Sequence, residues 1–288
     1  MKQRILTALW LIPLALLWMF AANDHVFAVG AAALLALASW EWGKFVCPAK
    51  PLLYAPAPVL CALGGCIALN PFSPSFGASV AASPVSVALL SAGALWWVIA
   101  LALVLLYPRN VSLVRNPWLA GTAGILVLTP FFWSLLYLHA MHPAAILPFE
   151  SGGANLFFVM LLVWCADSGA YFAGKAFGRH RMSPAVSPNK TLEGLAGGVL
   201  LSLAAALGAG LGAVKDGFAV NGWFVAAVTL AVAASVLGDL AESMFKRASG
   251  IKDSSNLLPG HGGVLDRVDS LTAALPVFSL VMYLGSGI

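Results

Sequence analysis

Apolar segments without charged side chains recur along the whole chain, separated by short polar or proline-containing stretches. A membrane-spanning helix needs about 20 consecutive apolar residues. The pattern predicts nine such helices, at approximately residues 5–22, 26–43, 52–70, 85–107, 118–141, 154–173, 192–213, 222–243 and 268–286. The third is the least regular, because prolines crowd its start and Gly64 and Gly65 lie inside it. These residues indicate a kinked or partial span.

Composition indicates the same class of protein. Hydrophobic residues make up 61% of the 288 residues and charged residues 9%, with a mean hydropathy of +0.92. Soluble domains have roughly 45–50% apolar and roughly 25% charged residues, so we expect an all-α polytopic integral membrane protein. The net charge is +4, but no nucleic-acid-binding motif is present, and we expect no nucleic-acid partner. The four cysteines lack metal-ligand spacing and are interpreted as reduced, small hydrophobic residues.

The Lys and Arg residues fall almost entirely on one side of the predicted membrane. Fourteen of the 15 lie in the N-terminal segment or in the loops after spans two, four, six and eight, and only Lys215 lies on the other side. The positive-inside rule makes the first side cytoplasmic, so the N-terminus is predicted inside and Ile288 outside. The apolar stretch after Lys2 and Arg4 exceeds the roughly 7–15 residues of a signal-peptide core, and we expect it to stay as the first span.

Charge is distributed unevenly between the two halves of the chain. Residues 1–150 are predicted to form a transmembrane scaffold of about five helices. Residues 151–288 carry most of the acidic groups and are predicted to form a catalytic part of about four helices, with cytoplasmic loops at 174–191 and 244–267. Three histidines, His25, His139 and His142, fall on the predicted outer side and are interpreted as interfacial residues.

The densest charge lies in residues 243–269, where seven of 27 side chains are charged. The basic members suit phosphate oxygens, and they are Lys246, Arg247, Lys252 and Arg267. Asp266 and Asp269 lie three residues apart on one helical face, where they suit a Mg²⁺-nucleotide. Between Lys252 and Asp266 lies a turn, Pro-Gly-His-Gly-Gly, in which Gly262 and Gly263 permit a backbone concavity for an anion. For His261, in the same turn, direct catalysis and a merely structural place are equally compatible with the sequence.

A second polar constellation follows span six. Asp167 lies near the end of an apolar helix, where an ionisable group predicts function, although a structural hydrogen bond is the alternative. Further along, Ser187, Asn189, Lys190 and Glu193 surround a predicted helix N-terminus, which suits a phosphate group.

The end of span eight carries two more acidic residues. Asp239 shares a helical stripe with Ser243 and with Lys246 or Arg247, so it is predicted to join the metal site. The alternative for Asp239 is an intramembrane ion pair with one of those cations. Glu242 lies off that stripe and is interpreted as a solvated or paired surface group.

Two runs of residues carry a resemblance to a known family. Residues 243–269 resemble the signature of phosphatidate cytidylyltransferases, also called CDP-diacylglycerol synthases, in the pattern S-x-hydrophobic-K-R-x4-K-D-x-S-x2-L-P-x-H-G-G-V-x-D-R-V-D. The runs Asp167–Tyr171 and Ser187–Gly194 are similar to the family's D-S/T-x-A-Y and S-P-x-K-T-x-E-G motifs. Leu192 departs from the pattern, because the family commonly has an aromatic residue there.

The resemblance implies a reaction and a setting for it. It implies a polytopic enzyme of phospholipid biosynthesis in the bacterial inner membrane, which joins CTP and phosphatidic acid into CDP-diacylglycerol with release of pyrophosphate. It also implies Mg²⁺, with one ion or two left open, and a homodimer.

For this reaction, the polar residues take expected roles at a catalytic cleft on the cytoplasmic membrane edge. The expected metal ligands are Asp239, Asp266 and Asp269. The expected catalytic groups are Lys190, Lys246, Arg247, Lys252, His261 and Arg267, and the expected substrate-binding residues are Asp167, Ser187, Asn189, Lys190, Glu193, Gly262 and Gly263.

Two other functions remain open at the level of the sequence. A CTP-dependent lipid-alcohol kinase shares the nucleotide and the membrane with a cytidylyltransferase. A secondary transporter also has intramembrane charges and broken helices, but its carboxylates typically lie near mid-span in related halves. In this chain they gather at one predicted membrane edge, in one half.

Overall fold

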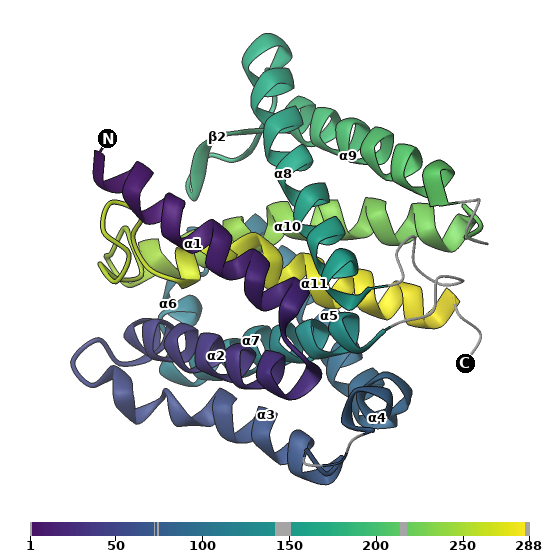
Figure 1. The fold of residues 1–288 in the computed structure, drawn as a ribbon. Helices are drawn as coiled ribbons and strands as arrows, with labels where there is room; N and C mark the ends of the chain where they lie inside the picture. Colours follow the sequence, from purple (N-terminus) through teal and green to yellow (C-terminus); the bar gives the residue numbers. More distant parts are fainter. Residues whose placement is uncertain (1, 72, 74, 142–150, 214–217, 286–288) are drawn as a thin grey trace.

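The chain folds into helices joined by short connections, with one two-stranded sheet (Figure 1). The computed structural model describes residues 2–71, 73, 75–141, 151–213 and 218–285, so Lys215, His142 and Ile288 lie outside the described residues, as do the side chains of Lys2 and Arg4. The elements are α1 (Lys2–Ala21), α2 (Asp24–Val46), η1 (Pro51–Leu53), α3 (Pro56–Ala68), α4 (Phe76–Ala82), α5 (Pro84–Leu106), α6 (Val111–Val114), α7 (Pro117–Ala140), α8 (Gly152–Phe177), β1 (Arg181–Ser183), β2 (Ser187–Thr191), α9 (Leu192–Ala213), α10 (Gly222–Ala248) and α11 (Leu265–Gly285).

Several long helices begin at polar residues that cap their first turn. The side chains of Asn23, Ser83, Asn116, Ser151 and Asn221 each accept a hydrogen bond from a backbone N–H two or three residues further on. Such caps satisfy donors that have no partner inside the helix. The starts of α2, α5, α7, α8 and α10 therefore follow from local sequence.

The all-α polytopic fold class is confirmed. Among the described residues, eight helical segments are long and apolar enough to cross a membrane, and they correspond to predicted spans two to nine. The first predicted span lies on α1, for which the side chains from Leu9 to Ala21 are described as an apolar helical segment, so the total of nine spans stays a prediction. The third span does begin irregularly, with the 3₁₀ turn η1 before α3.

Helix α7 lies at the centre of the helices of this chain. Its residues from Val127 to Ala140 are all buried, and it contacts α2, α3, α4, α5, α8 and α11. A helix that is apolar all round belongs in a protein core or in a membrane, and in α7 the second half is covered by other helices of the chain. Helices α5 and α7 of the first half contact α11, and α5 also contacts α10, so the predicted scaffold packs directly on the predicted catalytic part.

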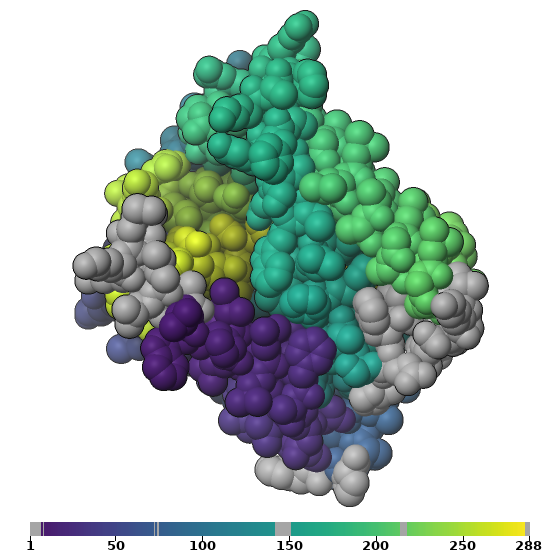
Figure 2. All heavy atoms as spheres, turned by 45° about the horizontal axis from the view of Figure 1, so that its top comes forward, coloured from purple at the N-terminus to yellow at the C-terminus, as the bar shows by residue number. Residues whose placement is uncertain are grey.

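Helices α8 and α9 form a pair that projects from the rest of the molecule (Figure 1). The predicted loop 174–191 is shorter than expected, because α8 continues to Phe177 and the antiparallel strands β1 and β2 occupy most of the segment between α8 and α9. The glycines of α9 explain the close pairing, since a Cβ at Gly198 would lie 2.7 Å from the Ala166 carbonyl oxygen of α8. Figure 2 shows α10, α11 and their connection lying in the recess between this pair and α1.

The basic segments after spans two, four, six and eight come together. Lys44 Nζ donates to the Ser254 carbonyl oxygen (2.7 Å), and Arg115 Nε donates to the Ala248 carbonyl oxygen (2.7 Å) at the end of α10. Lys190 Nζ, from the segment after span six, donates to the Val236 carbonyl oxygen (3.4 Å). These contacts place the four segments on one side of the helices, as the charge pattern predicts. Which side is cytoplasmic stays a prediction.

One histidine differs from its interpretation as an interfacial residue. His139 is buried, with its ring stacked on Phe27 at 3.9 Å between centroids and its Nδ1 atom 2.9 Å from Asp24 Oδ1. The reason is tertiary, because the start of α2 lies against the end of α7 and covers the imidazole.

Candidate active site

The site is built around the connection between α10 and α11, residues 249–264, which we call the signature loop. Its tip is a tight turn in which His261 N–H donates to the Leu258 carbonyl (2.8 Å) and Leu258 N–H donates to the Gly262 carbonyl (2.9 Å). The turn needs φ values of +77° at Gly260 and +83° at Gly262, which residues with a Cβ rarely adopt. These φ values explain two of the three glycines in the Pro-Gly-His-Gly-Gly turn.

Asp266, on the first turn of α11, joins the two ends of the signature loop to α10. Its carboxylate accepts hydrogen bonds from Lys246 Nζ (2.7 Å), from Gly263 N–H (2.8 Å) and from both the N–H and the hydroxyl of Ser254 (both 2.9 Å to Oδ2). Its side chain is only 6% exposed. Both carboxylate oxygens therefore have protein donors, and Asp266 fixes the position of the Lys246 ammonium group.

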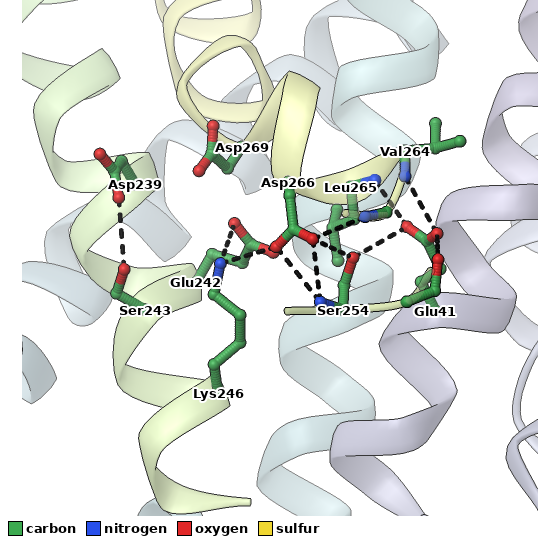
Figure 3. Close-up of polar contacts among 12 residues, drawn as sticks. Glu41, Asp239, Glu242, Ser243, Lys246, Ser254, Val264, Leu265, Asp266 and Asp269 are labelled. Carbon is green, nitrogen blue, oxygen red and sulfur yellow. Dashed lines mark hydrogen bonds and ion pairs between the residues drawn. The ribbon is translucent and has the colours of Figure 1, made fainter. Parts of the chain in front are cut away.

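Glu41 of α2 holds the same loop from the other side, and the sequence pattern did not single it out (Figure 3). It is fully buried and accepts bonds from the hydroxyls of Ser254 (3.2 Å) and Ser255 (2.5 Å) and from the N–H groups of Val264 (3.0 Å) and Leu265 (2.6 Å). The sequence could have indicated Glu41, because an acidic residue inside an apolar helix by itself predicts a functional site.

Lys190 and Asp239 connect the two constellations that the sequence separates. Lys190 Nζ, on β2, lies 2.7 Å from Asp239 Oδ2 on α10, and Asp239 Oδ1 accepts a hydrogen bond from Ser243 Oγ (3.3 Å). The ion pair of Asp239 is thus made with Lys190, rather than with Lys246 or Arg247 as the alternative interpretation held. The β1–β2 hairpin brings this lysine over α10, which no local pattern indicates.

Glu242 is buried, and its interpretation as a surface group is wrong. It is 3% exposed, and its Oε2 lies 3.3 Å from Lys246 Nζ, while neither carboxylate oxygen has a hydrogen-bond partner among the described residues. Asp269 of α11 lies beside it. The cause is close packing of α11 on α10 at Gly238, where a Cβ would meet the Asp269 carbonyl oxygen at 2.5 Å.

The expected metal ligands lie where α11 packs on α10, with Asp239 on α10 and Asp266 and Asp269 on α11, but their partners differ. Among the described residues, no three His, Cys, Asp or Glu side chains lie close enough to hold an ion by themselves. Mg²⁺ does not require such a group, because it is usually held by one or two carboxylates together with substrate phosphates. The carboxylate oxygens of Glu242, beside Lys246 and with Asp239 and Asp269 as neighbours, are hard donors of the kind that Mg²⁺ prefers.

Two hollows open beside these groups. The larger, about 620 Å³, is lined by Lys252, Asp253, Asn256, Leu258, Pro259, Gly260, His261, Gly262 and Arg267. The smaller, about 300 Å³, is lined by Asp167, Ala170, Tyr171, Met182, Ser187, Asn189, Lys190, Thr191, Gly194, Leu195 and Val236.

Most predicted substrate-binding and catalytic residues line one hollow or the other, and four do not. Lys246 is held by Asp266 instead. Glu193 instead accepts hydrogen bonds from His180 Nδ1 (2.6 Å) and from the N–H of Arg179 (3.0 Å). Gly263 is buried beside Glu41 and Ser254, and a Cβ at this position would collide with both side chains. Arg247 is exposed on α10 and lines neither hollow.

Carboxylates and cations facing two hollows, at one end of a set of membrane-length helices, define a membrane-embedded enzyme suited to phosphate chemistry. Comparison with known proteins identifies it further. Residues 2–284 match the model of the cytidylyltransferase family, and the chain belongs to that family.

Two relatives match nearly the whole chain, and a third matches less than half of it. The chain is 40% identical to the phosphatidate cytidylyltransferase of Pseudomonas aeruginosa over 296 residues, which cover 98% of this chain and 97% of that protein. It is also 40% identical to the phosphatidate cytidylyltransferase of Haemophilus influenzae over 286 residues, 97% of each chain. A Staphylococcus aureus protein of the same name is 46% identical over 128 residues, which are 44% of this chain and 48% of that one.

Proposed function

We propose that this protein is a phosphatidate cytidylyltransferase, which transfers the cytidylyl group of CTP to phosphatidic acid and releases pyrophosphate. The names of the full-length relatives support the reaction. The observation that carries it in this molecule is the Lys190–Asp239 ion pair, because it joins the hollow beside α8 to the charged groups of α10 and α11. Two anionic substrates need cations in both hollows, and Lys190 supplies one in the smaller hollow while Lys252 and Arg267 supply two in the larger.

The two hollows suit different substrates. The larger is lined mainly by polar groups and glycines, with Lys252 and Arg267 as its cations, and we assign it to the nucleotide. The smaller combines Lys190 with apolar side chains such as Met182 and Leu195, and its walls belong partly to α8 and α9, which expose many apolar residues. We assign it to the phosphate of the lipid, whose acyl chains stay in the bilayer.

Reaction by direct displacement follows from these assignments. A phosphatidate oxygen attacks the α-phosphorus of CTP, a new phosphorus–oxygen bond forms, and the bond to the bridging oxygen of the departing pyrophosphate breaks. The phosphatidate phosphate is already anionic at neutral pH, so it needs positioning and charge neutralisation more than a base. Lys190, Lys246, Lys252 and Arg267 supply that neutralisation, and exposed Arg247 adds to the positive field nearby.

Magnesium completes the charge balance when it is bound, by neutralising triphosphate oxygens. We assign Asp239 and Asp269 as its ligands, with Glu242 beside them. Asp266, the third ligand expected from the sequence, already accepts bonds from Lys246, Ser254 and Gly263, and we assign it to ordering the loop and the lysine.

The setting of the reaction completes the proposal. The relatives are bacterial and the chain has many membrane-length helices, so it is a multi-pass protein of the inner membrane. Because CTP is cytoplasmic, the end that carries the signature loop faces the cytoplasm. The C-terminus then lies outside, because α11 crosses the membrane away from that end, and the N-terminus lies inside if α1 also crosses. Assembly as a homodimer remains an expectation from the family resemblance.

Incubation of the purified protein with α-labelled CTP, Mg²⁺ and either phosphatidate or a lipid alcohol tests the function. Label entering the lipid fraction only with phosphatidate is the expected result. Label recovered in CDP, with unlabelled phospholipid formed from the alcohol, would indicate a kinase instead. No label transfer by a folded, monodisperse sample would favour transport. Lys246→Met serves as the matched negative control, because it removes the ammonium group that Asp266 holds.

A further inference from the structure

We propose that Glu41 is a positioning residue for this reaction, which orders the signature loop from the N-terminal half of the chain. The inference rests on the proposed function. It assigns a role in the reaction to α2, a helix that the sequence places in the scaffold.

Hydrogen bonds from a single segment offset the free-energy cost of burying the Glu41 carboxylate. All four donors to its carboxylate belong to the signature loop or to the first residue of α11. Among the described residues, no Lys, Arg or His lies within ion-pair distance of it. A buried carboxylate without a counter-ion is costly unless its hydrogen bonds are complete. The loop therefore has one arrangement in which that requirement is met.

A short chain of contacts leads from Glu41 to a group in the proposed reaction. The Ser254 hydroxyl oxygen lies 3.2 Å from Glu41 Oε2 and 2.9 Å from Asp266 Oδ2, so its single proton is shared between two carboxylates. Asp266 Oδ1 in turn accepts the bond from Lys246 Nζ at 2.7 Å. Figure 3 shows these groups in a row from α2 to α10. The position of the Lys246 ammonium group thus depends on the position of Glu41.

Two further residues fit this role. Lys44, one turn after Glu41 on α2, holds the Ser254 carbonyl oxygen, so both side chains bind the same point of the loop. Gly263 has no side chain where Ser254 and Glu41 approach, since a Cβ there would clash with Ser254 Oγ and lie 2.6 Å from Glu41 Oε1. This close approach explains why the third glycine of the Pro-Gly-His-Gly-Gly turn is needed, and contact with a substrate is not required to explain it.

The proposal is tested by comparing three variants with the wild type in lipid nanodiscs. Glu41→Gln keeps the shape but loses the charge and turns an acceptor into a donor. Ser255→Ala removes one donor and leaves Glu41 in place. Asp24→Asn is the matched control, because it neutralises a carboxylate at the other end of the same helix, where the partner is His139. Each is assayed for kcat, for KM with CTP and phosphatidate, for thermal midpoint, and for the rate of trypsin cleavage after Lys252 in the loop.

Glu41→Gln is expected to lower kcat at least tenfold with KM changes below threefold, and to speed cleavage after Lys252 at least fivefold. Ser255→Ala is expected to lower kcat three- to tenfold without changing the thermal midpoint, and Asp24→Asn to stay within twofold. Glu41→Gln with kcat within threefold of wild type, or an equal loss in Asp24→Asn, overturns the proposal. If Glu41→Gln does not fold, Ser255→Ala decides, and full activity in that variant overturns it.

Failure of the proposed function gives a different result. In that case the wild type itself transfers no label to lipid, whereas the cleavage rates after Lys252 still report whether Glu41 orders the loop.

Discussion

Replacement of Gly238 by alanine tests whether the close approach of α10 and α11 sets the geometry of the site. Gly238 directly precedes Asp239, and the atom that its new methyl group would meet is the carbonyl oxygen of Asp269. The substitution therefore acts between the two carboxylates that we assign to Mg²⁺, without changing either of them.

The size of the effect follows from the distances. The new Cβ would lie 2.5 Å from the Asp269 oxygen and 3.2 Å from the Ala273 Cβ, whereas ordinary contact begins at 3.4 Å. Because the nearest atom belongs to backbone, the helices must separate locally by about 0.9 Å. Overpacking of this kind costs about 1–3 kcal/mol of stability. A displacement of about 1 Å at a reacting centre costs about 100-fold in rate, so we expect a kcat about 100-fold lower.

The assay is cytidylyl transfer measured below the thermal midpoint of each variant, with saturating CTP and phosphatidate. Gly208→Ala on α9 is the matched control, because a Cβ there meets nothing within 4 Å. Alanine is favoured over glycine in a helix by about 0.8–1.0 kcal/mol, so this control should be at least as stable as the wild type and fully active. A Gly238→Ala protein with kcat within threefold of wild type would refute the reasoning.

Three further predictions concern topology, metal binding and the chemical step. In a variant without native cysteines, a cysteine at Gly287 should react with an impermeant reagent in intact cells and one at Asn256, which is exposed in the loop, should not; the reverse pattern contradicts the orientation. Asp269→Asn should reduce turnover at least 100-fold without lowering the thermal midpoint, because it removes one negative charge from beside Glu242; loss of folded protein would instead indicate a structural role. His261→Gln should retain part of the activity, and a chiral α-thio CTP should give inversion at the α-phosphorus, whereas retention or a nucleotide adduct on His261 would indicate two displacements.

The positions of the membrane-length helices could be predicted from the sequence, because each must satisfy its backbone hydrogen bonds and cover its length with apolar side chains locally. The caps at Asn23 and Ser83 are similarly local. The signature residues could also be found, since charge in an apolar chain is conspicuous. The end of α8 was predicted several residues too early, because Lys175 was interpreted as part of a loop although it lies in the last turn of the helix.

The partners of the charged residues were decided only by the tertiary structure. Glu41 meets Leu265 across 224 positions of sequence, and Lys190 meets Asp239 through the β1–β2 hairpin. No local sequence pattern predicts either contact, because both contacts arise from the packing of α2 and of the hairpin against α10 and α11. Glu242 shows the same limit, since helical spacing says which residues share a stripe but not which stripe a neighbouring helix will cover. The sequence alone therefore indicates which segments are membrane-length helices and which residues carry charge, whereas packing decides which of those charges meet.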